Sequence, residues 1–294
     1  MRLPPRDDTT LWGLGLSGGA DSTALLLRCA EAGFPVRPLH FNHAFPDENG
    51  DEAEDFCRAL CRRLGLPLLA ARCPETRPPR ETKEVFARRH RMVFFADAAR
   101  RLGLGGILLA HQADDRAENL ILRLARGSGL GGLSSFGIEG TLPGVPGVRL
   151  WRPLLDETHA AQVAWLQAHG ESWVEDASNA DTSIPRNAIR HLLLPRLPHF
   201  TAGANATADL LAEEDAFLEP LAENAVETRT ERALALHPGT PPVLCRRALR
   251  RWLPGLTRTW LERLCALPEG QIVQTPGAVR VEKTRPGAWR RLAD

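Results

Sequence analysis

The stretch of this sequence with the clearest chemical potential reads Ser17, Gly18, Gly19, Ala20, Asp21 and Ser22. An apolar run precedes it and a leucine-rich helical pattern follows, so it joins a predicted strand to the start of a predicted helix. The free N–H groups and positive dipole at a helix start favour an anion such as phosphate. The glycines let the backbone approach a phosphate oxygen, and Asp21 offers a carboxylate for a metal ion on the phosphates. We therefore predict a phosphate-binding loop, the plainer alternative being a glycine turn with an ordinary helix cap.

A second such stretch runs from His111 to Asn119 and carries three carboxylates. Asp114 lies near the start of a predicted helix, while Asp115 and Glu118 are three residues apart and share a helix face. Such carboxylates could hold magnesium, bind an ammonium group or accept a proton from an attacking amine. Taken alone, the pattern also fits solvated acids near a helix dipole. We favour a functional role because this stretch follows a predicted strand of the same sheet.

Arginines in two further places could contact a polyanion. Arg126 opens a glycine-rich stretch that we interpret as a flexible loop, either a plain connector or a lid or nucleic-acid loop. Arg186 and Arg190 are four residues apart on a short predicted helix and share a face. Their plainer interpretation is a surface helix with solvated arginines. The spacing alone leaves both alternatives open.

Alternating strands and helices predict how these residues are positioned. Strands are expected over 11–16, 36–41, 66–71 and 105–110, and helices over 20–33, 51–64, 81–102 and 114–126. This alternation predicts an α/β fold with a Rossmann-like parallel sheet, helices on both faces and right-handed crossovers. The loops at the carboxyl ends of the strands then share one edge. We expect the phosphate-binding loop, Asn42-His43 and His111–Asp115 to meet there.

The rest of the chain predicts a second part. The expected elements are a helix capped by Asp156 and ending at His169, a helical stretch over 204–235 interrupted at Pro220, helices over 243–253 and 259–265, and a hairpin over 271–291. We expect a catalytic domain over 1–200, a helical connector over 201–240 and a small basic domain over 241–294. That last domain is expected to be α+β or mainly helical.

The amino-acid composition limits the cellular compartment and the binding partners that we expect. The 294 residues are 43% hydrophobic, which suffices for a sizeable core. The sequence has no signal-like or membrane-spanning run, and its six cysteines lack a C-x-x-C pair, so we expect a cytoplasmic protein with reduced thiols and no membrane partner. The formal net charge of +1 hides an acidic stretch over 201–240 and an arginine-rich stretch over 241–294. The arginine-rich stretch is a candidate polyanion-binding surface.

The segment Ser17–Ser22 resembles the Ser-Gly-Gly-x-Asp-Ser motif of the PP-loop ATP pyrophosphatases and matches neither the Walker loop nor the dinucleotide motif. That superfamily cleaves ATP between its α and β phosphates and passes AMP to a carbonyl oxygen. The resemblance therefore implies adenylation with ATP and leaves the acceptor open.

Further motifs over residues 11–200 make the chain resemble the tRNA(Ile)-lysidine synthases of the short form. In order, they are Asn42-His43; Ala87-Arg88 with Arg91; His111, Asp114, Asp115 and Glu118; Arg126–Leu130; Arg152–Leu155; Asp176 with Ser178-Asn179; and Arg186-Asn187 with Arg190 and Pro195. Two departures stand out. The family usually has Leu-Arg after His43, where this chain has Ala44, Phe45 and Pro46, and Arg116 and Asn119 stand where Gln and Thr are common.

This resemblance implies that the wobble cytidine of a CAU-anticodon tRNA(Ile) is converted to lysidine with ATP, Mg²⁺ and free L-lysine. Cytosine O2 would attack the α-phosphate, and the lysine amine would then displace AMP at C2. The resemblance assigns nucleotide binding to the Ser17–Ser22 loop, His43, Arg91 and His111, with Asp21 as metal ligand.

The same resemblance assigns substrate binding to Asp114, Asp115, Glu118, Arg126, Arg186 and Arg190. Asp21, Asp115 and Glu118 are the expected catalytic residues, and either Asp115 or Glu118 accepts the proton of the attacking amine. The sequence leaves this choice open.

The main alternative is another PP-loop adenylating enzyme, either a tRNA thiolase or a small-molecule amidating ligase. The missing C-x-x-C pair weakens the first of these, and the lack of a recognisable glutaminase domain weakens the second. A nucleotide-binding module without catalysis would have a degraded acidic cluster, whereas all of its carboxylates are present. The oligomeric state is left open, a homodimer included.

Overall fold

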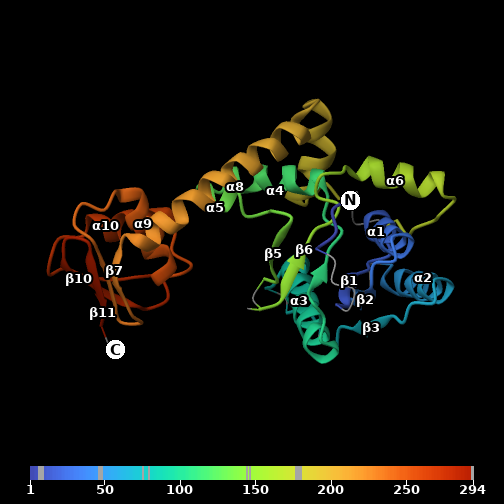
Figure 1. Cartoon of the computed structure of the whole chain (residues 1–294), viewed down its shortest axis with the longest axis horizontal. Coiled ribbons are helices and arrows are strands. Elements are labelled where there is room, and N and C mark those ends of the chain that lie inside the picture. Colours follow the sequence, from blue (N-terminus) through green and yellow to red (C-terminus); the bar gives the residue numbers. More distant parts are fainter. Residues whose placement is uncertain are drawn as a thin grey trace. The chain divides into compact units, whose positions relative to one another are not determined.

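A computed structural model of the chain describes residues 1–5, 10–45, 49–74, 76–78, 80–143, 145, 147–175 and 181–292. The chain divides into two compact units (Figure 1). The first comprises Met1–Ser128 and Ser135–Asp209, and the second comprises Gly129–Ser134 and Leu210–Asp294. Within the described residues, no helix has both the length and the apolar character needed to cross a membrane.

A six-stranded sheet organises the first unit, in the order β3-β2-β1-β4-β6-β5. Its strands are β1 (Trp12–Gly15), β2 (Val36–Asn42), β3 (Leu69–Arg72), β4 (Ile107–Leu108), β5 (Glu139–Thr141) and β6 (Arg149–Trp151). All neighbours pair in parallel except β5, which is the antiparallel edge strand. The predicted parallel α/β sheet is confirmed, and its strand order reverses beside β1, where such sheets bind ligands.

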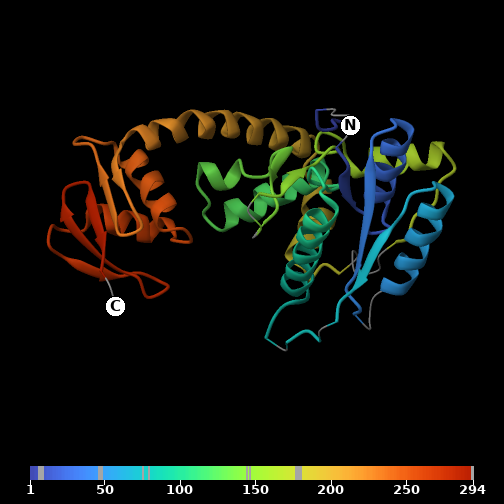
Figure 2. The same ribbon diagram turned by 60° about the horizontal axis from the view of Figure 1, so that its bottom comes forward.

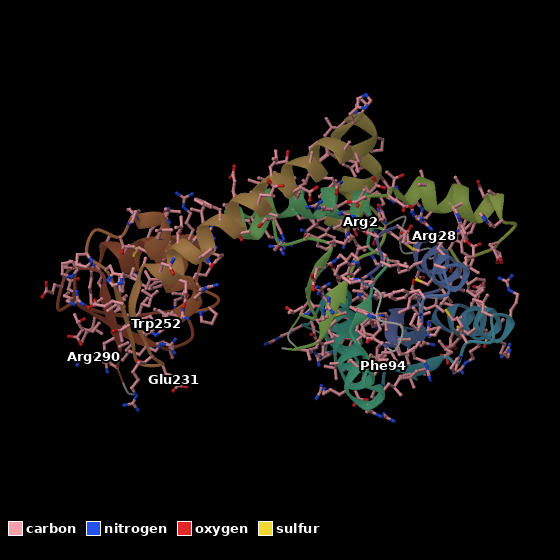
Figure 3. The ribbon with its side chains drawn as sticks, in the orientation of Figure 1. Arg2, Arg28, Phe94, Glu231, Trp252 and Arg290 are labelled. Atoms are coloured by element: carbon pink, nitrogen blue, oxygen red, sulfur yellow. The ribbon has the colours of Figure 1, made fainter. Side chains whose placement is uncertain are left out.

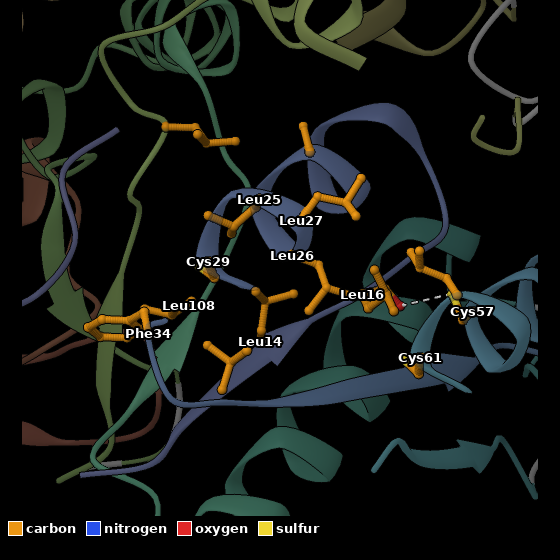
Figure 4. Packing of buried hydrophobic residues seen from close by; sticks show 14 of the residues in the cluster. Leu14, Leu16, Leu25, Leu26, Leu27, Cys29, Phe34, Cys57, Cys61 and Leu108 are labelled. Carbon is orange, nitrogen blue, oxygen red and sulfur yellow. Dashed lines mark hydrogen bonds between the residues drawn. The ribbon is translucent and has the colours of Figure 1, made fainter. Parts of the chain in front are cut away.

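Helices cover both faces of this sheet. They are α1 (Ala20–Glu31), α2 (Gly50–Arg63), α3 (Lys83–Leu102), α4 (Ala113–Ala125) and α6 (His159–Ala168). Residues of α1, α2 and α6 share one buried cluster with Leu14 and Leu16, while α3 shares another with Leu39 and Ile107. Figure 4 shows the first cluster, in which the Cys57 thiol faces the carbonyl oxygen of Leu16 at 3.9 Å.

Two glycines of β1 make room for α3. A Cβ at Gly15 would lie 2.8 Å from a methyl carbon of Leu109 and 3.0 Å from the ring of Phe95 in α3. A Cβ at Gly13 would meet three side-chain carbons below 3.0 Å. Because alternate residues of a strand face opposite sides, Trp12 and Leu14 of β1 pack in the cluster that includes α1, while its glycines leave room on the side of α3.

The second unit has a five-stranded antiparallel sheet in the order β7-β8-β11-β10-β9. Its strands are β7 (Val226–Arg229), β8 (Ala233–Leu236), β9 (Ile272–Gln274), β10 (Arg280–Arg285) and β11 (Ala288–Arg291), and its helices include α9 (Pro242–Trp252) and α10 (Arg258–Ala266). Figure 2 shows these strands beside the two helices, in orange to red. Leu249 of α9, Leu264 of α10 and Trp289 of β11 share its core. Of the two expected architectures, this part is the α+β one.

Three local predictions need correction. The helix expected from Asp156 begins instead at His159, because the Thr158 hydroxyl accepts the N–H of Ala161 and caps it. The helical stretch predicted over 204–235 is α8 (Phe200–Asn224) followed by β7 and β8, whose pairing in the sheet overrides the helical pattern. Pro220 lies inside α8 and does not end it. The predicted glycine-rich loop contains a single helical turn, α5 (Leu130–Leu133).

Candidate active site

The Ser17–Ser22 loop closes tightly between β1 and α1. Gly18 has φ +91°, a left-handed conformation that favours glycine. The Ser22 hydroxyl accepts the N–H of Ser17 and donates to the carbonyl of Gly19, both at 3.1 Å. Gly19 is the N-cap of α1, and no side chain caps that helix within the described residues. The first N–H groups of α1 are therefore available to an anion.

Asp21 lies in the first turn of α1 and contacts a residue that the sequence analysis missed. Its Oδ1 is 2.9 Å from Nδ1 of His159, the first residue of α6. The hydrogen bond with Asp21 raises the pKa of His159 above its ordinary value, although burial opposes this. No sequence signal pointed to His159, because 138 residues separate the two partners.

Asp115 and Glu118 share a face of α4, as predicted, and both meet arginines. Arg186 lies in α7 (Pro185–Ala188), and Arg190 lies in the π-helical turn η2 (Ile189–Leu193) that follows it. Glu118 accepts from Arg186 Nε at 2.7 Å and from Arg190 Nε at 2.6 Å. Asp115 Oδ1 accepts from the Nη2 atoms of both arginines, at 3.0 and 3.2 Å. We call these four residues the carboxylate–arginine cluster.

This cluster is closed on the carboxylate side. The Glu118 side chain is 0% exposed, whereas those of Arg186 and Arg190 are 33% and 32% exposed. Asp115 Oδ2 also accepts the N–H of Gln112, which fixes the start of α4. Burial lowers the pKa of each arginine, but the two carboxylates outweigh it and raise both pKa values. The two carboxylates are therefore paired with two guanidinium groups that stay charged.

Asp114 has a different environment from the other two carboxylates. Its Oδ2 accepts the backbone N–H of His159 at 3.0 Å, and its Oδ1 accepts the hydroxyl of Thr201 at 3.1 Å. Asn205, one turn further along α8, donates to the carbonyl of Ala113 at 3.0 Å. Asp114 thus connects the starts of α4, α6 and α8, which makes it a structural junction as well as a candidate substrate ligand.

A group of basic side chains comprises His43, Arg91 and His111, in which Arg91 affects the pKa of both imidazoles. Burial, followed by Arg91, lowers the pKa of His43 to about 4. Burial lowers the pKa of His111 to about 3, although Asp115 opposes the shift. Burial also lowers the pKa of Arg91, to about 10, and the nearby Arg88 and Arg186 add to this effect. Both imidazoles are consequently neutral at pH 7, and Arg91 supplies the charge.

This basic group has unmet hydrogen-bonding capacity. Within the part of the chain that the structure describes, the buried Nε of Arg91 and the buried Nδ1 atoms of His43 and His111 have no hydrogen-bond partner. A buried guanidinium nitrogen without a hydrogen-bond partner is costly unless an acceptor joins it. The three residues come from the end of β2, from α3 and from the end of β4, and β2 and β4 are the two strands that flank β1.

The structure thus brings most of the predicted residues to one edge of the sheet. Arg126 is an exception, since it is exposed at the C-cap of α4, at the opposite end of that helix from Asp115. Arg186 and Arg190 are directed onto the carboxylates. Pro46, Asp176, Ser178 and Asn179 lie outside the described residues.

Comparisons with known proteins identify the family. The model of the PP-loop domain matches residues 3–197. The tRNA(Ile)-lysidine synthases of Chromobacterium violaceum and Polaromonas naphthalenivorans are each 36% identical, over 75% and 85% of this chain and over 52% and 76% of their own lengths. The one of Nitrosomonas europaea is 32% identical, over 96% of this chain and 59% of its own length. The chain thus spans little more than half the length of two of these relatives.

A solved structure supports the fold alone. The U34-tRNA thiolase NcsA of Methanococcus maripaludis, solved with its [4Fe-4S] cluster, superposes with a TM-score of 0.59 at 14% identity, over 70% of this chain and 73% of that one. The PP-loop match covers the whole six-stranded sheet, and the Polaromonas relative is matched over three quarters of its length. On this evidence the chain belongs to the PP-loop proteins and, among them, to the tRNA(Ile)-lysidine synthase family.

Proposed function

We propose that the chain ligates lysine to C2 of the wobble cytidine of CAU-anticodon tRNA(Ile), consuming ATP and releasing pyrophosphate and AMP. The observation that carries this proposal is that three groups lie on helices beside neighbouring strands: the uncapped start of α1, Arg91 with its unpartnered Nε, and the carboxylates of α4. Family membership supports the tRNA substrate. We place the reaction in the cytoplasm, where tRNA, ATP and free lysine are found together.

In this proposal the Ser17–Ser22 loop binds the β and γ phosphates of ATP. The hydrogen bonds of Ser22 fix the loop before the reaction, so the uncapped N–H groups at the start of α1 would stabilise charge that develops on the leaving pyrophosphate. Asp21 stands at this loop with a partly exposed carboxylate, and carboxylate and hydroxyl oxygens are suitable Mg²⁺ ligands. Mg²⁺ bound there would neutralise phosphate charge and orient the leaving group.

Arg91, His43 and His111 are proposed to contact the nucleotide. The guanidinium of Arg91 would pair with a phosphate, and its Nε would so gain the partner that it lacks among the described residues. The two imidazoles, neutral at pH 7 because their pKa values are about 4 and about 3, would contribute hydrogen bonds without further charge.

Asp115 and Glu118 are proposed to bind the ammonium group of lysine and to accept its proton. The amine must lose a proton before it can attack C2, so a carboxylate within reach is chemically required. Both carboxylates are already paired with Arg186 and Arg190. Lysine must therefore compete with these two guanidinium groups.

We infer that tRNA relieves this competition. Arg186 and Arg190 are about one-third exposed, so they can turn toward phosphates while their carboxylate partners stay buried. Lysine would then bind more tightly to the complex with tRNA than to the free protein. Calorimetric titration of lysine with and without tRNA tests this order, and equal affinities in both titrations would contradict it.

The second unit, including the proposed basic domain over 241–294, is proposed to bind the tRNA backbone. Arginines of this domain are paired with acids, among them Arg247 with Asp215 and Glu219, Arg251 with Glu219 and Glu223, and Arg258 with Glu262. Arg250 and Arg263 are exposed and have no carboxylate partner within the described range. These two are therefore the best candidates for phosphate contacts.

The test of the proposed function mixes the full chain with ATP, Mg²⁺, bulk tRNA and labelled lysine. We expect label in tRNA, together with equal amounts of AMP and pyrophosphate. ADP and phosphate as products would refute the PP-loop chemistry. AMP formation without lysine transfer would favour the alternative that the chain adenylates its substrate for another nucleophile.

A further inference from the structure

Two thiols meet in the second unit at a place that the proposed reaction does not use. Cys245 of α9 and Cys265 of α10 have their Sγ atoms 3.0 Å apart. This separation is only about 1 Å longer than the ~2.0 Å bond of a disulfide. Cys245 is buried and Cys265 is partly exposed, so Cys265 is the member of the pair that a reagent in solution reaches first.

The surroundings of the pair distinguish its two members. The hydrogen bond with Cys245 lowers the pKa of Cys265, and the positive charges of Arg246 and Lys283 act in the same direction against burial. The pKa of Cys245 is raised by the same hydrogen bond and by burial. Lys283 is held close by, since its Nζ donates to the carbonyl of Cys265 at 2.6 Å. Cys265 is therefore the better nucleophile of the two.

The other four cysteines provide the contrast. Burial raises the pKa of Cys29 and Cys57 to about 12 and that of Cys61 to about 11, and Cys73 is also buried. Cys57 and Cys61 are one turn apart in α2, with Cys57 0% and Cys61 1% exposed. Across the described residues, no group of three or more His, Cys, Asp or Glu side chains is placed to hold a metal ion. The Cys245–Cys265 pair therefore fits covalent redox chemistry better than metal binding.

We propose that Cys245 and Cys265 form a reversible disulfide that joins α9 to α10 when the chain meets a disulfide oxidant such as oxidised glutathione. The Cys265 thiolate attacks one sulfur of oxidised glutathione, whose S–S bond breaks and releases one glutathione thiolate. Cys245 then loses its proton and attacks Cys265 Sγ, which expels the second glutathione. The protein loses two hydrogen atoms and is oxidised, and oxidised glutathione is reduced to two glutathione molecules.

The disulfide would link residues 20 positions apart and fix the two helices against each other. Closing this loop lowers the entropy of the unfolded chain, so the oxidised second unit unfolds at a higher temperature. A change of about 4 °C or more is expected, and dithiothreitol would reverse it. This inference does not depend on the proposed function.

The experiment treats the full chain, under native conditions, with oxidised glutathione, then unfolds it in denaturant and alkylates the remaining thiols, because the other four cysteines are buried in the folded chain. Mass spectrometry should show a loss of two hydrogen atoms, one linked peptide pair containing Cys245 and Cys265, and alkylation of the other four of the six cysteines. Dithiothreitol should restore six alkylated cysteines. An unchanged mass, a stable glutathione adduct on the wild-type chain, or a disulfide elsewhere would overturn the proposal.

Variants test the assigned order of attack. Cys245→Ser should accumulate the glutathione adduct on Cys265, because the second thiol that expels glutathione is missing. Cys265→Ser should form neither adduct nor disulfide. Cys61→Ala is the matched control, since it removes a buried thiol of α2 and should leave the disulfide intact. An adduct on Cys245 in Cys265→Ser, as abundant as that on Cys265 in Cys245→Ser, would refute the assigned nucleophile.

Discussion

The carboxylate–arginine cluster predicts a large stability loss for Glu118→Gln. The replacement keeps the shape of the side chain but turns one acceptor oxygen into an NH₂ group that faces an arginine donor. Glu118 accepts three hydrogen bonds, at 2.6, 2.7 and 3.2 Å, with its side chain 0% exposed. Breaking a buried ion pair on one side costs about 3–5 kcal/mol. Because Arg186 and Arg190 are one-third exposed, water can solvate part of their charge, so we expect about 3 kcal/mol.

The assay is urea unfolding followed by hydrogen exchange and mass spectrometry of peptides from α4, which reports on the first unit separately from the second. The matched control is Glu139→Gln, which breaks the ion pair of Glu139 with Arg149, in which both side chains are about half exposed. The control should have little effect, as exposed pairs generally do. A loss below about 1 kcal/mol for Glu118→Gln, or an equal loss in the control, would refute the reasoning.

Four further predictions follow from the structure. Burial raises the pKa of Glu157, but Arg28 (labelled in Figure 3), the N-terminal amino group and Gln162 outweigh it and lower the pKa from 4.5 to about 2. The wild type should therefore exceed Glu157→Gln in stability by about 2 kcal/mol at pH 7 after allowance for solvent screening, and this difference should disappear as the pH falls from 4.5 toward 2 in thermal unfolding. Arg91→Met should weaken ATP binding by about tenfold or more without lowering the free energy of unfolding, because it removes a half-buried charge whose Nε has no hydrogen-bond partner among the described residues; a stability loss in urea unfolding would contradict this. Asp115→Ala should reduce labelled-lysine transfer by about 10²-fold and change ATP affinity little, and the reverse result would assign Asp115 to the metal. Arg250→Ser and Arg263→Ser should each reduce the slope of log tRNA affinity against log salt by about 1, whereas the paired Arg258 should give no change when replaced by Ser.

The sheet and the Ser17–Ser22 loop could be predicted because their signals are local. Strand and helix periods are visible within a few residues, and the loop motif lies within six consecutive positions. The Asp21–His159 contact has no such signal, since each partner alone is an ordinary residue at a helix start. The same holds for Glu118 and Arg186, which are 68 residues apart in sequence. Local patterns show which faces residues occupy, whereas the pairing of faces depends on the packing of distant helices.

The helix prediction for the last part of the stretch over 204–235 is wrong for the same reason, because α8 ends at Asn224. The apolar and alanine-rich character of that last part is compatible with a helix, yet β8 pairs with β11, more than fifty residues later in the chain. The hydrogen bonds of that pairing, and the burial of Leu234 and Leu236 against α9, outweigh a weak helical preference. A helix–strand choice of this kind depends on partners that the local sequence does not specify.

The sequence predicted free positive charge in the second unit, whereas the structure pairs much of it with acidic side chains. The acidic stretch over 201–240 beside the arginine-rich stretch over 241–294 predicted a surface for a polyanion, but much of this asymmetry is neutralised within the second unit. Asp215, Glu219 and Glu223 follow each other at four-residue intervals along α8, and Arg247 and Arg251 of α9 pair with them. An arginine count therefore overstates the positive charge available to a polyanion. Arginines that belong to such a ladder hold helices together, and those that form no ion pair within the described residues, such as Arg250 and Arg263, are the ones expected to release counterions when phosphate binds.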